Sequence, residues 1–436
     1  MVEDMADAGM RSGRRKRAGG VAAVTLVTTV ALLSGACSSG GAKPAANGGT
    51  TTSPATTPSP TTTSPPSPTT TTSPPPTTTT PPKTTTTPAP PPATTSPALP
   101  GNLSLQQLAG QRVIYSYQGL TPPQHLLDQI KAGDVGGVIF FGGNISTEAQ
   151  ITGVISELRH AQAASPVHLP LLLMTDQEGG IVKRLPGPPF VSAKQIGESS
   201  NPVAAANTAG TAAGQNMSGV GMNMNLAPVL DVYRTPGNFL DAAQRSFSQN
   251  PNTVAQLGSA FLVSQQNVGV AATGKHFPGL GAAPNGANTD ERPVTLNVSL
   301  NDLRSIDEIP YTAAIQNGLK VVMMSWAVYP ALDPNRPAGL SSTVVQTELR
   351  GHIGFKGVTI TDALEAGALQ AYGGAANRAL VAAEAGMDLL LCSSGDPAQG
   401  DAAAQAIVNG VNSGKLSRAG FDAAVGRVDA LRGGLK

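Results

Sequence analysis

Cysteine is nearly absent from this chain of 436 residues, which contains only Cys37 and Cys392. Cys37 directly follows a short apolar run near the amino terminus, so its chemistry belongs to that segment. Cys392 is then alone in the long C-terminal region, which excludes an internal disulfide there. We therefore expect this region to be held together by the burial of apolar side chains.

The chain also lacks an excess of charge of one sign, with 28 Lys and Arg against 27 Asp and Glu. Export with loss of residues 1–36 would remove five of these basic and three of the acidic residues, which leaves a net charge of −1. No basic stripe remains that would indicate nucleic acid, and near-neutrality favours no class of partner. The sequence shows no metal-ligand cluster, phosphate loop or Ser-His-Asp order, so we expect no metal and no cofactor.

The apolar run Val21–Leu33 is shorter than the roughly 20 residues that a membrane-spanning helix needs. It follows the basic stretch Arg11–Arg17 and precedes the small residues Ser34–Ala36, which is the layout of a signal peptide over residues 1–36. The position of Cys37 resembles the lipobox of bacterial lipoproteins, in which this cysteine becomes the lipidated first residue. In that motif the leucine lies three residues before the cysteine, whereas here it lies four before. The alternative is an ordinary cleaved signal peptide with an incidental cysteine.

Residues 37–100 consist almost entirely of Ser, Thr, Pro, Ala and Gly, with no aromatic residue and with Lys43 and Lys83 as the only charges. Such a segment has too little apolar surface to offset the entropy of ordering. Its prolines favour an extended spacer of about 3.1 Å per residue. We predict a disordered linker that holds the following domain away from a membrane, with tracts that are typical of O-glycosylation.

Residues 101–436 alternate between short apolar runs and helix-like segments such as Thr147–Ala163, Thr253–Gln266 and Ala375–Ala385. The eight apolar runs are Val113–Tyr117, Val138–Phe141, Leu171–Thr175, Met222–Leu226, Val270–Gly274, Val321–Ser325, Val358–Thr361 and Met387–Leu391. This pattern is typical of a parallel sheet covered on both faces by helices. An open doubly wound sheet shares it, but the count of eight predicts a single α/β domain of the (β/α)8 TIM-barrel type.

In such a barrel the chemistry lies at the C-terminal ends of the strands. Polar residues follow five of the eight expected strands, in the segments Asp176–Gly180, Ala227–Asp231, Lys275–Gly279, Ser325–Trp326 and at Asp362. This rim predicts a site for a polar ligand that is uncharged or weakly charged.

Six segments at or near these strand ends form a larger pattern: Asp176–Arg184, Asn225–Asp231, Arg245–Phe247, Lys275–Gly279, Tyr329–Pro334 and Gly354–Asp362. In sequence and order they resemble the family 3 glycoside hydrolases, and within them the β-N-acetylglucosaminidases of bacterial cell-wall recycling. The resemblance implies retaining hydrolysis of terminal β-linked N-acetylglucosamine through a covalent glycosyl-aspartate. It also implies a glycan substrate such as a muropeptide or disaccharide, met at the outer face of the cytoplasmic membrane.

Asp362 and Glu365 have the spacing of a capping box, so the residues alone favour a helix that begins at Asp362. The resemblance instead implies that Asp362 is the catalytic nucleophile, projecting from the end of the seventh strand toward the anomeric carbon.

The resemblance further implies sugar-binding roles for Asp176, Arg184, Arg245, Lys275 and His276. Asp176 would accept hydrogen bonds from the outer hydroxyls of the terminal sugar. Without the resemblance, a structural role is the alternative for each residue. Lys275 would be a surface charge and His276 a histidine in a turn, and Asp176 would stabilise a glycine-rich turn. Asp231 would either bind the sugar or only orient Arg245 and Lys275.

The pattern breaks at the general acid/base, which the glucosaminidase branch carries as a histidine in the loop after the Lys-His-Phe-Pro-Gly motif. Here the loop 280–292 has no histidine, and its carboxylic acids are Asp290 and Glu291. One hypothesis is a retaining hydrolase that uses one of these two as acid/base, with Asp290 preferred because Arg292 is close. The other is a glycan-binding wall lipoprotein with little turnover, since losing a general acid costs about 10²–10⁴-fold. Retention of the nucleophile favours the enzyme.

Overall fold

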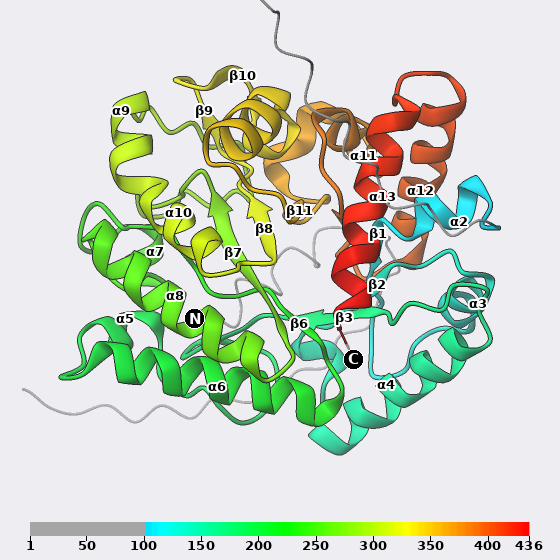
Figure 1. The fold of residues 1–436 in the computed structure, drawn as a ribbon, viewed down its shortest axis with the longest axis horizontal. Coiled ribbons are helices and arrows are strands. Elements are labelled where there is room, and N and C mark those ends of the chain that lie inside the picture. The colour runs from blue at the N-terminus through cyan, green and yellow to red at the C-terminus, as the bar shows by residue number, and fades with distance from the viewer. Residues whose placement is uncertain (1–101, 436) are drawn as a thin grey trace, which may run out of the picture. The chain divides into compact units, whose positions relative to one another are not determined.

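The computed structural model describes residues 102–435, and its fold is drawn in Figure 1. The expected signal peptide over residues 1–36, the lipidation site Cys37 and the linker 37–100 lie outside the described residues. No helix within residues 102–435 is both long enough and apolar enough to cross a bilayer.

Eight parallel strands form one sheet in the order β11-β8-β7-β6-β3-β2-β1-β12. A parallel bridge from Ile360 to Leu389 links its two edge strands, so the sheet is a nearly closed barrel. The strands are β1 (Val113–Tyr115), β2 (Gly137–Ile139), β3 (Leu172–Thr175), β6 (Met224–Asn225), β7 (Ala271–Phe277), β8 (Val321–Met324), β11 (Val358–Ile360) and β12 (Leu390–Leu391). Each of the eight predicted apolar runs contains or overlaps one strand, which confirms the predicted barrel.

The barrel interior is filled by a cluster of buried side chains to which all eight strands contribute. Successive side chains of a strand point to opposite faces. In β1, therefore, Ile114 packs into this inner cluster, whereas Val113 and Tyr115 pack in the larger cluster beneath the helices. This is why the strands are apolar on both faces.

Helices surround the barrel, as Figure 1 shows. The longer ones are α3 (Gln124–Ala132), α4 (Glu148–Ala163), α6 (Pro202–Val220), α8 (Pro251–Asn267), α10 (Ile309–Gln316), the π-helix η5 (Thr343–His352), α11 (Ala375–Ala385), α12 (Pro397–Asn412) and α13 (Arg418–Gly433). The predicted helices at 147–163, 253–266 and 375–385 correspond to α4, α8 and α11. Asn201, Asn250 and Asp396 cap α6, α8 and α12 through their side chains, and a proline follows each cap at the first helical position.

Short elements complete the described chain. They are α2 (Leu105–Gly110), α5 (Ala193–Gly197), α7 (Phe239–Ala242), α9 (Leu300–Asp302), η2 (Gly142–Asn144), η3 (Leu303–Asp307), η4 (Ala338–Leu340), η6 (Gly367–Tyr372) and the hairpins β4–β5 (Gln177–Gly179, Val182–Lys183) and β9–β10 (Val328–Tyr329, Asp333–Pro337). The hairpin β4–β5 follows β3 directly and so extends the C-terminal end of that strand.

Helix α13 covers the N-terminal ends of the strands. Its buried Arg432 donates to the carbonyl oxygens of Pro170 at 2.8 Å and Leu169 at 3.0 Å, just before β3. Its Arg427 binds the buried Asp388, just before β12, at 2.7 and 3.0 Å. Helix α13 therefore closes the end of the barrel where the strands begin, so a site can form only at the end where the strands finish.

The expected helix start at Asp362 is wrong. The next α-helix, α11, begins only at Ala375. Tertiary contacts hold the intervening chain out of helical geometry, because Leu364 donates its backbone N–H to Leu391 at 3.0 Å. Glu365 does not complete a capping box; its carboxylate accepts from the Ser393 hydroxyl at 2.6 Å.

Candidate active site

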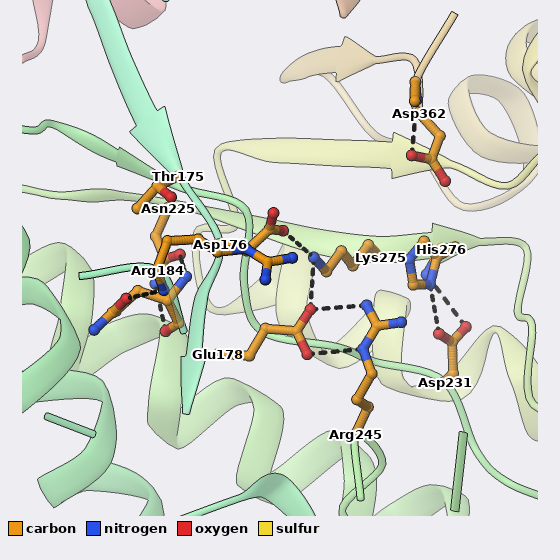
Figure 2. A network of polar contacts seen from close by, with 12 residues as sticks. Thr175, Asp176, Glu178, Arg184, Asn225, Asp231, Arg245, Lys275, His276 and Asp362 are labelled. Carbon is orange, nitrogen blue, oxygen red and sulfur yellow. Dashed lines mark hydrogen bonds and ion pairs between the residues drawn. The ribbon is translucent and has the colours of Figure 1, made fainter. Parts of the chain in front are cut away.

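The C-terminal ends of the strands bring the polar segments of the sequence together, as Figure 2 shows. Asp176 follows β3, Asp231 follows β6, Lys275 and His276 lie in β7, and Asp362 follows β11. These residues are separated by up to 186 positions along the chain, from 176 to 362. The barrel alone makes them neighbours, as the polar rim predicted.

Two of these side chains, Asp176 and Lys275, form an ion network with Glu178 and Arg245. Arg245 donates to both Glu178 carboxylate oxygens, at 2.8 and 2.9 Å. The Lys275 ammonium lies 2.7 Å from Glu178 and 2.7 Å from Asp176. Two anions thus face two cations, and bidentate geometry makes the Arg245 contact one of the stronger kinds of ion pair. We call these four residues the ion network.

Mutual pairing keeps every member of the ion network charged. Burial alone would raise the pKa of Glu178, but Arg245 and Lys275 hold it well below its usual range. Burial would lower the pKa of Lys275, yet Asp176 and Glu178 raise it above its usual value. The pKa of Asp176 is likewise lowered, against burial, by Lys275 and Arg184. The network therefore offers fixed donors and acceptors to a ligand across the neutral pH range.

Glu178 was not among the predicted site residues, although the segment Asp176–Gly180 was. Its central place depends on partners 67 and 97 residues later in the chain, which the sequence alone does not connect to it. A signal was present nonetheless: Asp176 and Glu178 are two residues apart, and alternate residues of an extended chain share a face.

Arg184 lies beside Asp176 at the edge of the ion network (Figure 2). Its backbone N–H is held by the side chain of Gln177 at 3.0 Å. Its Nε atom is buried, and none of the described residues accepts a hydrogen bond from it. Arg184 thus lies next to the site, and its sugar-binding role stays a prediction.

Asp231 is completely buried and serves His276. One oxygen lies 2.8 Å from His276 Nδ1, and the other accepts from the backbone N–H groups of His276 at 3.2 Å and Leu280 at 2.6 Å. The expectation that it orients Arg245 and Lys275 is wrong, because none of these hydrogen bonds reaches either of them. Asp231 is a positioning residue that leaves His276 Nε2 for a ligand.

Lys275 and His276 both belong to the site rather than to the protein surface. They are only 2% and 6% exposed, which excludes the reading as a surface charge and a turn histidine. The peptide between them is cis. Their side chains contact different carboxylates, Asp176 and Asp231 respectively.

Asp362 lies apart from the ion network at the end of β11 (Figure 2). One of its carboxylate oxygens accepts from the backbone N–H of Ala363 at 2.8 Å. The carbonyl of Ala363 in turn accepts from the indole of the buried Trp326 at 2.8 Å. Trp326 follows β8, so two adjacent strands fix the position of this carboxylate while leaving it partly exposed.

The loop 280–292 is attached to the segment that follows Asp362. The carbonyls of Thr289 and Asp290 accept from the backbone N–H groups of Ala368 at 3.0 Å and Gly367 at 2.7 Å. Thr289 is buried, whereas solvent reaches the side chain of Asp290. Surrounding protein limits the hydration of the Asp290 carboxyl, and this together with the charge of Asp362 raises its pKa to about 7.

Glu291 points elsewhere, and its carboxylate contacts Asn288 at 3.3 Å and Arg292 at 4.0 Å. The expectation that Arg292 positions Asp290 is wrong, because the Arg292 guanidinium contacts Gly286 and Glu291 rather than Asp290. The electrostatic influence of Asp362 on Asp290 supports the same preference on different grounds.

Residues 103–431 match the model of the glycosyl hydrolase family 3 N terminal domain. The chain is 46% identical over 339 residues to an uncharacterized secreted glycosyl hydrolase of Arthroderma benhamiae, across 77% of this chain and 95% of that protein. It is 34% identical over 273 residues to a β-hexosaminidase of Nitrosomonas eutropha, across 61% of this chain and 75% of that protein.

Among solved structures, the fold is similar to a glycoside hydrolase family 3 β-N-acetylglucosaminidase from Paenibacillus sp. str. FPU-7, with a TM-score of 0.70 and 34% identity. The similarity covers 76% of this chain and 63% of that one, so this chain spans slightly less than two thirds of that protein.

Proposed function

The chain belongs to glycosyl hydrolase family 3 and is a glycoside hydrolase, and on this basis we propose that it removes terminal β-linked N-acetylglucosamine from cell-wall glycans with retention of configuration. The similarity to a β-hexosaminidase and to a β-N-acetylglucosaminidase supports the choice of sugar. The observation that carries the mechanism is the pair of carboxyls Asp362 and Asp290, on two loops that are hydrogen-bonded to each other.

Retaining glycosidases need one ionised and one protonated carboxyl at neutral pH. Asp290, with its pKa raised to about 7, matches the acid, and the partly exposed Asp362 at the strand end matches the nucleophile. Asp362 attacks the anomeric carbon while Asp290 gives its proton to the departing glycosidic oxygen, which forms a glycosyl-aspartate ester and the free alcohol. Asp290 then takes a proton from water, the water oxygen attacks the anomeric carbon, and Asp362 is released.

The ion network would position the sugar for this reaction. Asp176 is partly exposed and has lone pairs beyond its contact with Lys275, so it can accept from sugar hydroxyls. His276, held through Nδ1, offers Nε2. Polar groups fixed in advance in this way bind sugar hydroxyls without a reorganisation cost.

The cell-wall substrate rests on location. The basic, apolar and small residues ahead of Cys37 and the similarity to a secreted relative support export with a lipid anchor at Cys37 and a linker over residues 37–100. Cys37→Ala should release the protein from the membrane fraction. Unchanged membrane retention of that variant would exclude lipid anchoring at this cysteine.

A second candidate function is glycan binding with little turnover, which is favoured by the loop 280–292 having no histidine. Turnover of an aryl β-N-acetylglucosaminide separates the two. The hydrolase should also be trapped by a 5-fluoro glycoside of N-acetylglucosamine, with the adduct on Asp362 in a peptide mass spectrum. An adduct on another residue would remove the assignment of the nucleophile.

A further inference from the structure

A cluster of three metal-ligating side chains lies outside the active site. Glu308 occupies the position before the first residue of α10, and Glu348 and His352 lie four residues apart on η5. One ligand atom from each residue lies within 4.8 Å of the others. Glu308 and Glu348 are 1% and 2% exposed, whereas the His352 side chain is 47% exposed and faces solvent.

The two glutamates are buried with only one countercharge. Arg304 donates to both oxygens of Glu348, at 2.7 and 2.9 Å, and so pairs with that residue alone. Glu308 adds a second carboxylate beside it, so the cluster carries more negative than positive charge when both are ionised. An unpaired charge in the interior is costly, and buried charges are paired or coordinate metals.

Glu308 is the residue that points to a ligand. Both of its carboxylate oxygens are buried and accept from no N–H or hydroxyl group among the described residues. Burial and the neighbouring Glu348 raise the pKa of Glu308 to about 8, so its one partner is a proton held against Glu348, which a bound cation would replace. Its side chain does not cap α10, although Glu308 occupies the cap position. Its two oxygens therefore have no structural task in the helix, and they are directed at a cluster that already holds a carboxylate and an imidazole.

We propose that Glu308, Glu348 and His352 form a binding site for a divalent transition-metal ion, with Zn²⁺ as the best match. Two carboxylate oxygens and one imidazole nitrogen are a donor set that Zn²⁺ accepts, with water at the remaining position on the exposed His352 side. Each carboxylate oxygen has a second lone pair, so the Arg304 contact does not use up Glu348.

Such an ion would join the start of α10 to η5, two outer helices that are distant in sequence. The described part of the chain has one cysteine, the buried free thiol Cys392, so it contains no disulfide to do this. The sequence did not reveal the cluster, because Glu348 and His352 are only a pair and the third ligand lies 40 residues before Glu348.

The test uses the full chain after treatment with a chelator and dialysis, titrated calorimetrically with ZnCl₂ and melted with and without it. We expect one Zn²⁺ per chain and a rise in Tm of about 3–5 °C at a hundredfold excess over Kd. Glu308→Gln should abolish both effects. It can still fold, because the amide keeps the volume and can donate to Glu348.

His352→Gln provides a second, exposed substitution that should weaken Zn²⁺ binding by at least tenfold. Glu384→Gln, the same chemical change at an exposed position of α11, is the matched control and should keep the wild-type response. The absence of a Zn²⁺ response in the wild type, with Glu308→Gln equally stable, would mean that the glutamates share a proton and would overturn the proposal. Equal binding by wild type and Glu308→Gln would also overturn it.

Discussion

The ion network and the pair Asp290–Asp362 occupy the same rim of the barrel but are built in opposite ways. In the ion network each charge has a partner of opposite sign at 2.7–2.9 Å, and its ionisation is fixed. In the pair, neither carboxyl has a cation bound to it among the described contacts, and burial together with the charge of Asp362 raises the pKa of Asp290 to about 7.

This difference separates binding from proton transfer. A group that binds sugar hydroxyls works best when its charge and position do not change. A general acid/base works best when its pKa lies near the operating pH, because it must both give and take a proton. The structure supplies the first environment by pairing opposite charges, and the second by limiting the hydration of Asp290 beside the charge of Asp362.

The largest effect should come from removing the nucleophile. Asp362→Asn should lower hydrolysis by on the order of 10⁴-fold or more, because the covalent step is lost. Binding of N-acetylglucosamine, measured by calorimetry, should persist, because the ion network is intact. Wild-type turnover by this variant would contradict the assignment of binding to the ion network and of the reaction to the pair Asp290–Asp362.

The two regions should also differ in their effect on stability. Lys275→Met leaves Asp176 and Glu178 with one cation fewer in a buried setting, and breaking such a pair costs about 3–5 kcal/mol. Asp290→Asn removes a carboxyl whose charged form is disfavoured by limited hydration and by the charge of Asp362, so it should not lower Tm. Chemical unfolding of both variants tests this contrast, which fails if Asp290→Asn is the more destabilising.

The smallest effect concerns the alkaline limb of the pH profile. Asp290 must be protonated to act as acid, so kcat/KM for glycosides with poor leaving groups should fall as pH rises through about 7. Glu365 also raises the pKa of Asp290, though less than burial and Asp362 do. Glu365→Gln should therefore move this limb to lower pH while the acid-side plateau is kept. A shift of the alkaline limb to higher pH would contradict this account, because removing a nearby negative charge must lower the pKa of Asp290.

The fold could be predicted from the sequence, because the patterns that indicate its strands and helices are local. Each strand is a short apolar run, and each run is followed by a segment with the composition of a helix. The polar rim was accessible for the same reason, since Asp176, Lys275 and Asp362 stand directly at strand ends.

The partners of the individual side chains could not be predicted from the sequence, because they are residues far away along the chain. Asp231 pairs with His276, 45 positions away, and not with Arg245 and Lys275, which was one of the two alternatives for it. The segment that starts at Asp362 has the sequence of a helix N-terminus, but the hydrogen bond from the Leu364 N–H to the Leu391 carbonyl holds it as a loop. Local patterns predict elements, whereas the geometry of charge pairs is decided by the closed barrel.

The most direct test of the account is the dependence of Asp290→Ala on the leaving group. Without its acid, the enzyme should hydrolyse alkyl or sugar β-N-acetylglucosaminides about 10²–10⁴-fold more slowly. It should lose far less with nitrophenyl glycosides, whose leaving group departs without a proton, and azide should partly restore the latter rate. Glu291→Ala is the matched control and should resemble the wild type with both substrates. If the two variants slow both substrates equally, or leave them unchanged, Asp290 is not the acid/base. A wild type that also turned over slowly would then favour the glycan-binding protein.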